Sequence, residues 1–134
     1  MAPKTECYVD TSALIAALDR SDSHHSLYAR LFGAPPPLVT SALVIAEGHG
    51  WFLRRYHQQK AIQFLHFIRE LSPLTVLPFG SSDLGSVSAL LKKFADQNVT
   101  LADMHGLMVM RDRRIQLCWS TDRHLALTGA RLVM

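Results

Sequence analysis

The chain has 134 residues, of which 49% are hydrophobic and 19% charged, and its formal net charge at pH 7 is +3. The length fits one domain of about 100–150 residues, so we expect a single domain over residues 1–134, and the composition excludes an intrinsically disordered chain. Because acidic residues interrupt the early apolar positions and no uncharged run approaches roughly 20 residues, we expect a cytoplasmic protein without a secretory signal or membrane span.

The first half of the chain alternates short β-rich runs with helical patterns. An apolar run predicts a buried strand over residues 6–9 that ends at Asp10. There follow, in chain order, a helix through Leu18 that Thr11 or Ser12 can cap, a helix over residues 23–32, a strand over 38–40 and a helix over 41–55.

The second half continues this alternation. The patterns predict, in chain order, a helix over residues 58–71, a strand over 74–77, helices over 83–94 and 100–110, a strand over 115–119 and a short edge strand over 130–133. Strands that alternate with helices indicate an α/β fold with a mostly parallel sheet of four or five strands, covered by helices on both faces.

Four of the 11 acidic residues lie at unusual positions. Asp10 and Asp122 directly follow the first and fourth strands, and Asp103 lies in the first turn of the helix after Thr100. Because the carboxyl ends of parallel strands and the starts of the following helices share one edge, topology alone brings these three together. Glu47 lies within an apolar helix and reaches that edge only if the helix leans inward. As a carboxylate among apolar residues it needs a partner, and a metal ion would serve.

Clustered carboxylates have a chemical reason to hold a cation. Like charges at close range raise one another's pKa values, and a hard divalent ion such as Mg²⁺ or Mn²⁺ relieves the repulsion. Such an ion also activates water and neutralises charge on a phosphodiester. Each acid has a structural alternative as well: Asp10 could cap a helix, Asp103 could form a capping box with Thr100, and Asp122 could occupy a turn.

Four segments carry these acids, and their spacing fills the chain: YVDTSAL at 8–14, TSALVIAE at 40–47, VTLAD at 99–103 and STDRHL at 120–125. In this order they resemble the PIN-domain nucleases, and most closely the VapC-like toxins of toxin–antitoxin pairs. The resemblance implies a three-layer α/β/α fold. It also implies a Mg²⁺- or Mn²⁺-dependent endoribonuclease that leaves 5′-phosphate and 3′-hydroxyl ends on RNA, with a metal-binding quartet of Asp10, Glu47, Asp103 and Asp122.

The same resemblance carries further expectations. Ser12 matches the family's small polar residue beside the first acid and would orient a carboxylate or a water. Asp96 lies where relatives often carry an additional acid, although a helix-end or loop role is the simpler interpretation. Toxins of this kind usually form homodimers and are silenced by a small antitoxin, here a VapB-like protein. The segments GHGW at 48–51 and MHG at 104–106 depart from the pattern, and their glycines are expected to weaken the helices and alter the pocket lining.

A nuclease needs cations that hold phosphates near its acidic centre. Arg123 is a candidate phosphate-binding residue because it adjoins Asp122. Arg111 and Arg114 are further candidates because basic residues cluster in this part of the sequence.

Three histidines follow acids of the quartet by two positions each. Residues two apart on a helix point in nearly opposite directions, so His49 and His105 should not face the acids. His124 is expected in a loop, where no such argument applies, and it could contact substrate.

Three other interpretations remain open. A phosphatase of the haloacid dehalogenase kind would use Asp10 as nucleophile, but it normally has a second Asp at position 12, which is Ser here, and a later lysine, whereas none follows Lys93. A PIN-type RNA-processing nuclease without an antitoxin, or a non-catalytic PIN-like module that binds RNA or protein, would also fit. Absence of Mn²⁺ binding would favour the non-catalytic module.

Overall fold

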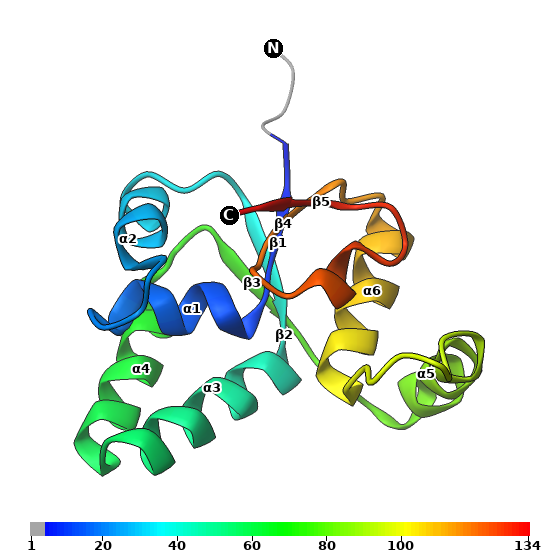
Figure 1. Cartoon of the computed structure of the whole chain (residues 1–134), viewed down its shortest axis with the longest axis horizontal. Helices are drawn as coiled ribbons and strands as arrows, with labels where there is room; N and C mark the ends of the chain where they lie inside the picture. The colour runs from blue at the N-terminus through cyan, green and yellow to red at the C-terminus, as the bar shows by residue number, and fades with distance from the viewer. Residues whose placement is uncertain (1–4) are drawn as a thin grey trace.

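The computed structural model describes residues 5–134, in which a five-stranded parallel sheet lies between two layers of helices (Figure 1). The strands are β1 (Cys7–Val9), β2 (Leu38–Ser41), β3 (Leu74–Leu77), β4 (Leu117–Trp119) and β5 (Arg131–Val133), in the order β3-β2-β1-β4-β5. The helices are α1 (Thr11–Leu18), α2 (His25–Gly33), α3 (Ala42–Arg55), α4 (Gln58–Glu70), α5 (Ser81–Lys93), α6 (Leu101–Arg113) and the 3₁₀ helix η1 (Arg123–Ala126). The predicted three-layer α/β/α fold is confirmed, and all four strand pairs are parallel.

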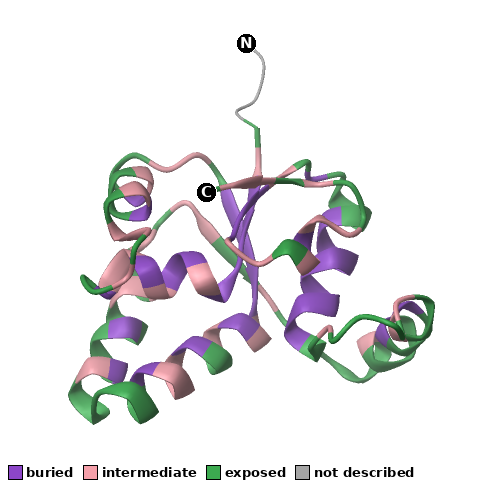
Figure 2. Ribbon diagram, viewed as in Figure 1, coloured by how far each residue is buried: buried purple, intermediate pink, exposed green. Residues whose placement is uncertain are grey.

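The sheet separates two hydrophobic cores. Helices α1 to α4 cover one face, and α5 and α6 cover the other (Figure 1). Alternate side chains of β1 point to opposite faces, so Cys7 and Val9 join the core beneath α1 to α4, whereas Tyr8 joins the core beneath α5 and α6. Strands β1 and β2 are buried throughout (Figure 2), which explains why their sequences do not alternate between apolar and polar residues.

Two glycines that depart from the family pattern allow close packing between elements. A Cβ on Gly106 of α6 would lie 2.8 Å from Cε1 of Tyr8, and a Cβ on Gly48 of α3 would collide with the Phe64 ring on α4. The sequence predicted that these glycines weaken their helices and alter the pocket. In addition, the structure shows that these two glycines let α6 approach β1 and α3 approach α4.

The end of α6 explains why the fourth strand begins later than predicted. Arg114 adopts a left-handed conformation with φ of 57°, and the N–H of Ile115 donates to the carbonyl of Met110 at 2.8 Å. Ile115 therefore belongs to the helix end, and the strand starts at Leu117. Within residues 5–134, no helix has the length and apolar character needed to cross a membrane.

Candidate metal centre

A cavity of about 360 Å³ opens at the carboxyl edge of the sheet, and we call it the acidic cavity. It is lined by Asp10, Thr11, Ser12, Ile15, Glu47, Trp51, Arg54, Thr100, Asp103 and Asp122. The four predicted acids and Ser12 are therefore brought together, although they come from segments up to 112 residues apart, between positions 10 and 122. The sheet topology brings them there, because β1 and β4 are neighbours and α6 starts beside their ends.

Asp10 is the most enclosed of the four acids, with 3% of its surface exposed. It stands at the start of α1, but its side chain makes no capping hydrogen bond, so the helix-cap alternative is wrong. Its Oδ2 instead accepts hydrogen bonds from Ser12 Oγ at 3.1 Å and Ser120 Oγ at 2.8 Å. Each hydroxyl in turn accepts a backbone N–H, from Thr121 and Asp122 respectively. The loop after β4 thus fixes the orientation of Asp10, with Ser120 as a contributor that sequence reasoning missed.

Glu47 reaches the cavity from an exposed position on α3. Ser41 caps α3 by accepting the N–H of Leu43 at 3.0 Å, and the helix then runs with one face open to the cavity. Glu47 is exposed on that face and accepts a hydrogen bond from the hydroxyl of Thr11. The sequence argument that Glu47 is a carboxylate among apolar residues in need of a partner is therefore wrong, although the residue does line the cavity.

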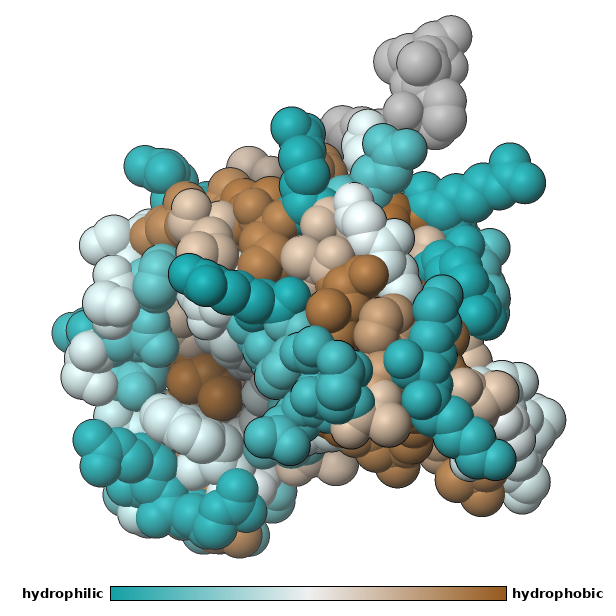
Figure 3. All heavy atoms as spheres, turned by 45° about the vertical axis from the view of Figure 1, so that its right-hand side comes forward, coloured by the Kyte–Doolittle hydropathy of each residue, from teal (hydrophilic) through white to brown (hydrophobic). Residues whose placement is uncertain are grey.

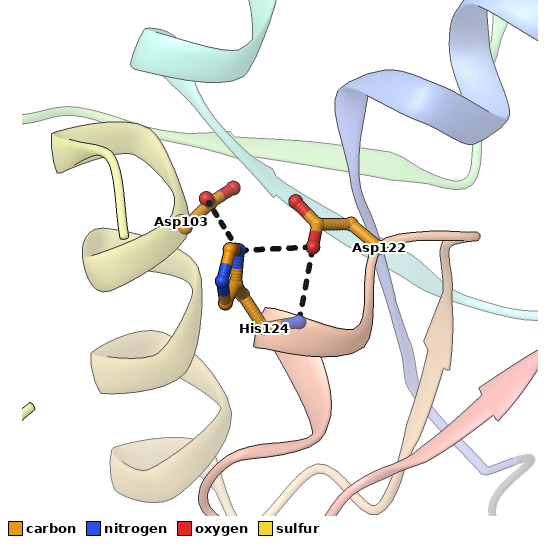
Figure 4. A group of neighbouring side chains, drawn as sticks. All are labelled: Asp103, Asp122 and His124. Atoms are coloured by element: carbon orange, nitrogen blue, oxygen red, sulfur yellow. Dashed lines mark hydrogen bonds and ion pairs between the residues drawn. The ribbon is translucent and has the colours of Figure 1, made fainter. Parts of the chain in front are cut away.

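Asp103 and Asp122 have structural roles as well as a place in the cavity. Asp103 forms the predicted capping box, since Thr100 Oγ1 accepts its N–H at 3.1 Å and its Oδ2 accepts the N–H of Thr100 at 3.3 Å. Asp122 Oδ1 accepts the N–H of His124 at 3.0 Å at the start of η1. Figure 4 shows the two carboxyl groups facing each other across the space between α6 and the loop after β4, beside the His124 imidazole.

Burial and neighbouring charges raise the pKa values of Asp10 and Asp103. Burial raises the pKa of Asp10, and the charge of Asp103 adds to that effect, although hydrogen bonds from Ser120 and Ser12 oppose it. Burial also raises the pKa of Asp103, with further contributions from the charges of Asp122 and Glu47. The folded chain therefore holds carboxylates where their ionised forms are disfavoured, and a divalent cation would reverse that penalty. The four carboxylates that line this cavity offer oxygen donors, which are the ligands that a hard divalent ion prefers.

The comparisons with known proteins agree with this geometry. The model of the PIN domain family matches residues 7–130. The chain belongs to the PIN-domain family. No curated protein matches it significantly.

Solved PIN-like structures share the fold at low sequence identity. The toxin VapC20 of Mycobacterium tuberculosis, described as cleaving the sarcin–ricin loop, superposes with a TM-score of 0.83 at 23% identity, covering 93% of this chain and 96% of that one. PAE2754 from Pyrobaculum aerophilum gives 0.64 at 21% identity, over 96% of this chain and 90% of that one. VapBC2 from Rickettsia felis, bound to a promoter DNA fragment, gives 0.63 at 12% identity, over 96% and 98%.

The arginines proposed from sequence lie apart from the acidic cavity of this PIN domain. Arg111 and Arg114 line a second cavity of about 430 Å³ at the C-terminal end of α6. Asp103 is near the N-terminal end of that helix, whose 13 residues span about 20 Å. Arg123 is exposed on η1 and does not line the acidic cavity. Figure 3, which brings the α5 and α6 side forward, shows hydrophilic side chains spread over this face with apolar areas between them.

Arg54 is the basic side chain that the PIN domain does place at the acids. Among the described residues that line the acidic cavity, it is the only basic one. Glu47, Trp51 and Arg54 follow one another at intervals of four and three residues, which puts them on one face of α3. A Cβ on Gly50 would lie 2.9 Å from Nη1 of Arg54, so this glycine leaves room for the guanidinium. The helical spacing between Glu47 and Arg54 was the feature of the sequence from which Arg54 could have been predicted.

Neither His49 nor His105 lines the acidic cavity, as the helical geometry predicted. His105 is buried, its Nδ1 lies 2.6 Å from Ser41 Oγ, and its ring packs edge-on against Phe79. Burial lowers its pKa, which favours the neutral imidazole. His105 is therefore a satisfied core residue. His124 differs, because its Nδ1 lies 3.1 Å from Asp122 Oδ1 and 3.9 Å from Asp103 Oδ2.

Proposed function

We propose that the chain is an endoribonuclease that hydrolyses RNA phosphodiester bonds with the help of Mg²⁺ or Mn²⁺. Asp10, Glu47, Asp103 and Asp122 would hold the ion. The observation that carries the proposal is the convergence of these four carboxylates in one cavity of a PIN-domain chain. Two of them have pKa values raised by burial and by their neighbours, as expected of groups that bind a cation in the active state.

The residues around the cavity would divide the work of hydrolysis. A bound divalent ion supplies a Lewis acid for a phosphate oxygen and lowers the pKa of water. Ser12 and Ser120 would hold the Asp10 carboxylate in one orientation, since both donate to its Oδ2. Arg54 would bind a non-bridging phosphate oxygen and offset the negative charge of the cavity. Water attacks phosphorus and the bond to the 3′ oxygen breaks, which leaves a 5′-phosphate and, once the leaving oxygen is protonated, a 3′-hydroxyl.

Cleavage of RNA by the purified chain is the direct test. We expect total RNA to be cut when Mg²⁺ or Mn²⁺ is present, DNA of matched sequence to survive, and EDTA to abolish cleavage. Asp10→Asn and Asp103→Asn should each reduce the rate by about 100-fold or more, because a ligand of the ion is lost. Asp112→Asn is the matched control, since Asp112 is an exposed acid paired with Arg111.

Three outcomes would contradict the proposal. Cleavage that survives EDTA, or that persists in Asp10→Asn, would refute a metal-dependent mechanism. Calorimetric titration that detects no Mn²⁺ or Mg²⁺ binding, together with absent cleavage, would support the non-catalytic PIN-like module instead.

We also propose that the chain is the toxin of a VapBC-like pair, silenced by a VapB-like antitoxin and active as a homodimer. The proposal draws on the four motifs and on the shared fold with VapC20 and VapBC2. Co-expression with any short reading frame that adjoins the gene tests the antitoxin: we expect a stable complex whose RNA cleavage is inhibited. Sedimentation of the free protein should give twice the chain mass. An active chain without such an inhibitor would support a PIN-type RNA-processing nuclease.

A further inference from the structure

We infer that the ion site of this chain includes a nitrogen donor, the imidazole of His124, and that it therefore prefers a first-row transition ion such as Mn²⁺ to Mg²⁺. The inference rests on the proposed metal-dependent function and specifies the ligands and the class of ion. The resemblance to the PIN-domain nucleases assigns four acids to the ion and does not include His124 among its ligands.

The distances suit a shared ion. One ligand atom from each of Asp103, Asp122 and His124 lies within 4.8 Å of the ligand atoms of the other two residues. Nδ1 is 3.1 Å from Asp122 Oδ1 and 3.9 Å from Asp103 Oδ2. Donors about 2.1 Å from one octahedral ion are about 3 Å apart when adjacent and about 4.2 Å apart when opposite. Both separations from Nδ1 fall within this range, and the two carboxylates lie within 4.8 Å of each other, so one ion can contact all three side chains after small adjustments.

The local backbone holds His124 in this position. Its N–H donates to Asp122 Oδ1 at 3.0 Å, which ties the histidine to the carboxylate at the start of η1. The next residue, Leu125, is fully buried in the core beneath α5 and α6 and anchors the turn. Figure 4 shows the imidazole on the side of the loop that faces α6, with one oxygen of each carboxyl group directed at Nδ1. The side chain is thus placed at the ion site by folded structure.

The chemistry of this donor set differs from that of four carboxylates. Mg²⁺ binds oxygen and keeps several waters, whereas imidazole is a ligand of first-row transition ions. Replacing one oxygen donor by nitrogen therefore raises affinity for transition ions relative to Mg²⁺. The variant His124→Asn is informative, because the asparagine Oδ1 can occupy the place of the histidine Nδ1 and supplies an oxygen donor instead of a nitrogen donor.

Pulsed electron paramagnetic resonance of Mn²⁺ bound to the RNA-free chain tests the inference. We expect a ¹⁴N coupling from a directly bound imidazole in the wild type and its loss in His124→Asn. Titration of Mn²⁺ and Mg²⁺ should show that His124→Asn lowers the Mn²⁺-to-Mg²⁺ affinity ratio by about 10-fold. His49→Asn is the control, since His49 lies outside the three-residue group, and it should keep both the coupling and the ratio.

The outcomes separate the two proposals. Mn²⁺ that binds and supports RNA cleavage without ¹⁴N coupling overturns the role of His124 and leaves the nuclease proposal intact. A coupling that persists in His124→Asn also overturns it. A wild-type chain that binds neither ion overturns the metal-dependent function itself. Because the wild-type spectrum alone reports the nitrogen ligand, the test does not depend on the folding of a variant.

Discussion

Replacing Gly106 by alanine should destabilise the protein, even though alanine favours helices. The added Cβ would lie 2.8 Å from Cε1, 2.9 Å from the hydroxyl and 3.0 Å from Cζ of Tyr8, all well inside ordinary contact distance. Tyr8 is fully buried in β1 and cannot swing away, so α6 must move outward by several tenths of an ångström. Such overpacking costs about 1–3 kcal/mol.

Gly85→Ala supplies the matched control for this measurement. Gly85 lies inside α5, and a Cβ added there would meet no atom within 4 Å, so alanine should stabilise by about 1 kcal/mol through helix propensity alone. Urea unfolding followed by circular dichroism should then place Gly106→Ala about 1–3 kcal/mol below Gly85→Ala. Equal stabilities of the two variants would refute the packing argument.

Gly106→Ala should also alter the acidic cavity. Asp103 lies three residues before Gly106 on α6, so outward movement of the helix separates its carboxyl group from Asp10. We expect weaker Mn²⁺ binding by Gly106→Ala and unchanged binding by Gly85→Ala. Tyr8→Phe should partly relieve the clash, because the Tyr8 hydroxyl is buried without a hydrogen-bond partner among the described residues and its removal costs little.

Three further predictions concern charge and capping. The folded-state pKa of Asp10 is raised, so between its unfolded and folded pKa values the folded state binds more protons than the unfolded state. The free energy of unfolding of the metal-free protein, relative to that of Asp10→Asn, should therefore fall as the pH rises from about 4. Urea unfolding at several pH values checks this, and a relative gain in stability with pH would contradict it. Arg54→Gln should raise KM for RNA and reduce the salt slope of binding by about one, whereas Arg111→Gln should leave catalysis near the acids unchanged; equal effects would count against Arg54. Ser41→Ala should cost about 1–2 kcal/mol in urea unfolding, since α3 loses its cap and His105 loses its hydrogen-bond partner, and an unchanged midpoint would refute the capping role.

The sequence was sufficient to predict where three of the acids meet. Asp10 and Asp122 follow neighbouring parallel strands, and Asp103 opens a helix beside them, so the alternation of strands and helices already implies a shared edge. What it could not supply was the hydrogen bonding of each carboxylate. The contact between Asp10 and Ser120 joins positions 110 residues apart and depends on the register of β1 with β4.

The α3 helix shows a second limit. Both faces of this helix are rich in small or apolar residues, so composition did not reveal which face is buried. The structure buries Val44, Gly48 and Phe52 and leaves Glu47 exposed toward the acids. Packing against α4 decides this orientation, through the contact between Gly48 and the Phe64 ring, and that contact is tertiary.

The clustering of arginines in the sequence did not predict which basic side chain lies near the acids, for a related reason. Residues 111–114 hold three arginines, yet a helix carries its two ends far apart, and Arg111 and Arg114 lie at the end away from Asp103. Seven positions along α3 from Glu47 bring Arg54 back to the same side, which no count of basic residues could reveal.

The order of strands in the sheet affects when during synthesis the acidic cavity can exist. β1 lies between β2 and β4, so the first strand made by the ribosome lacks one neighbour until almost the last one has emerged. Ser120 and Asp122 arrive with that late strand, and the hydroxyl that orients Asp10 arrives with them. A nascent chain therefore cannot assemble the proposed ion site, and the proposed nuclease would remain inactive on the ribosome until translation of this domain is nearly complete.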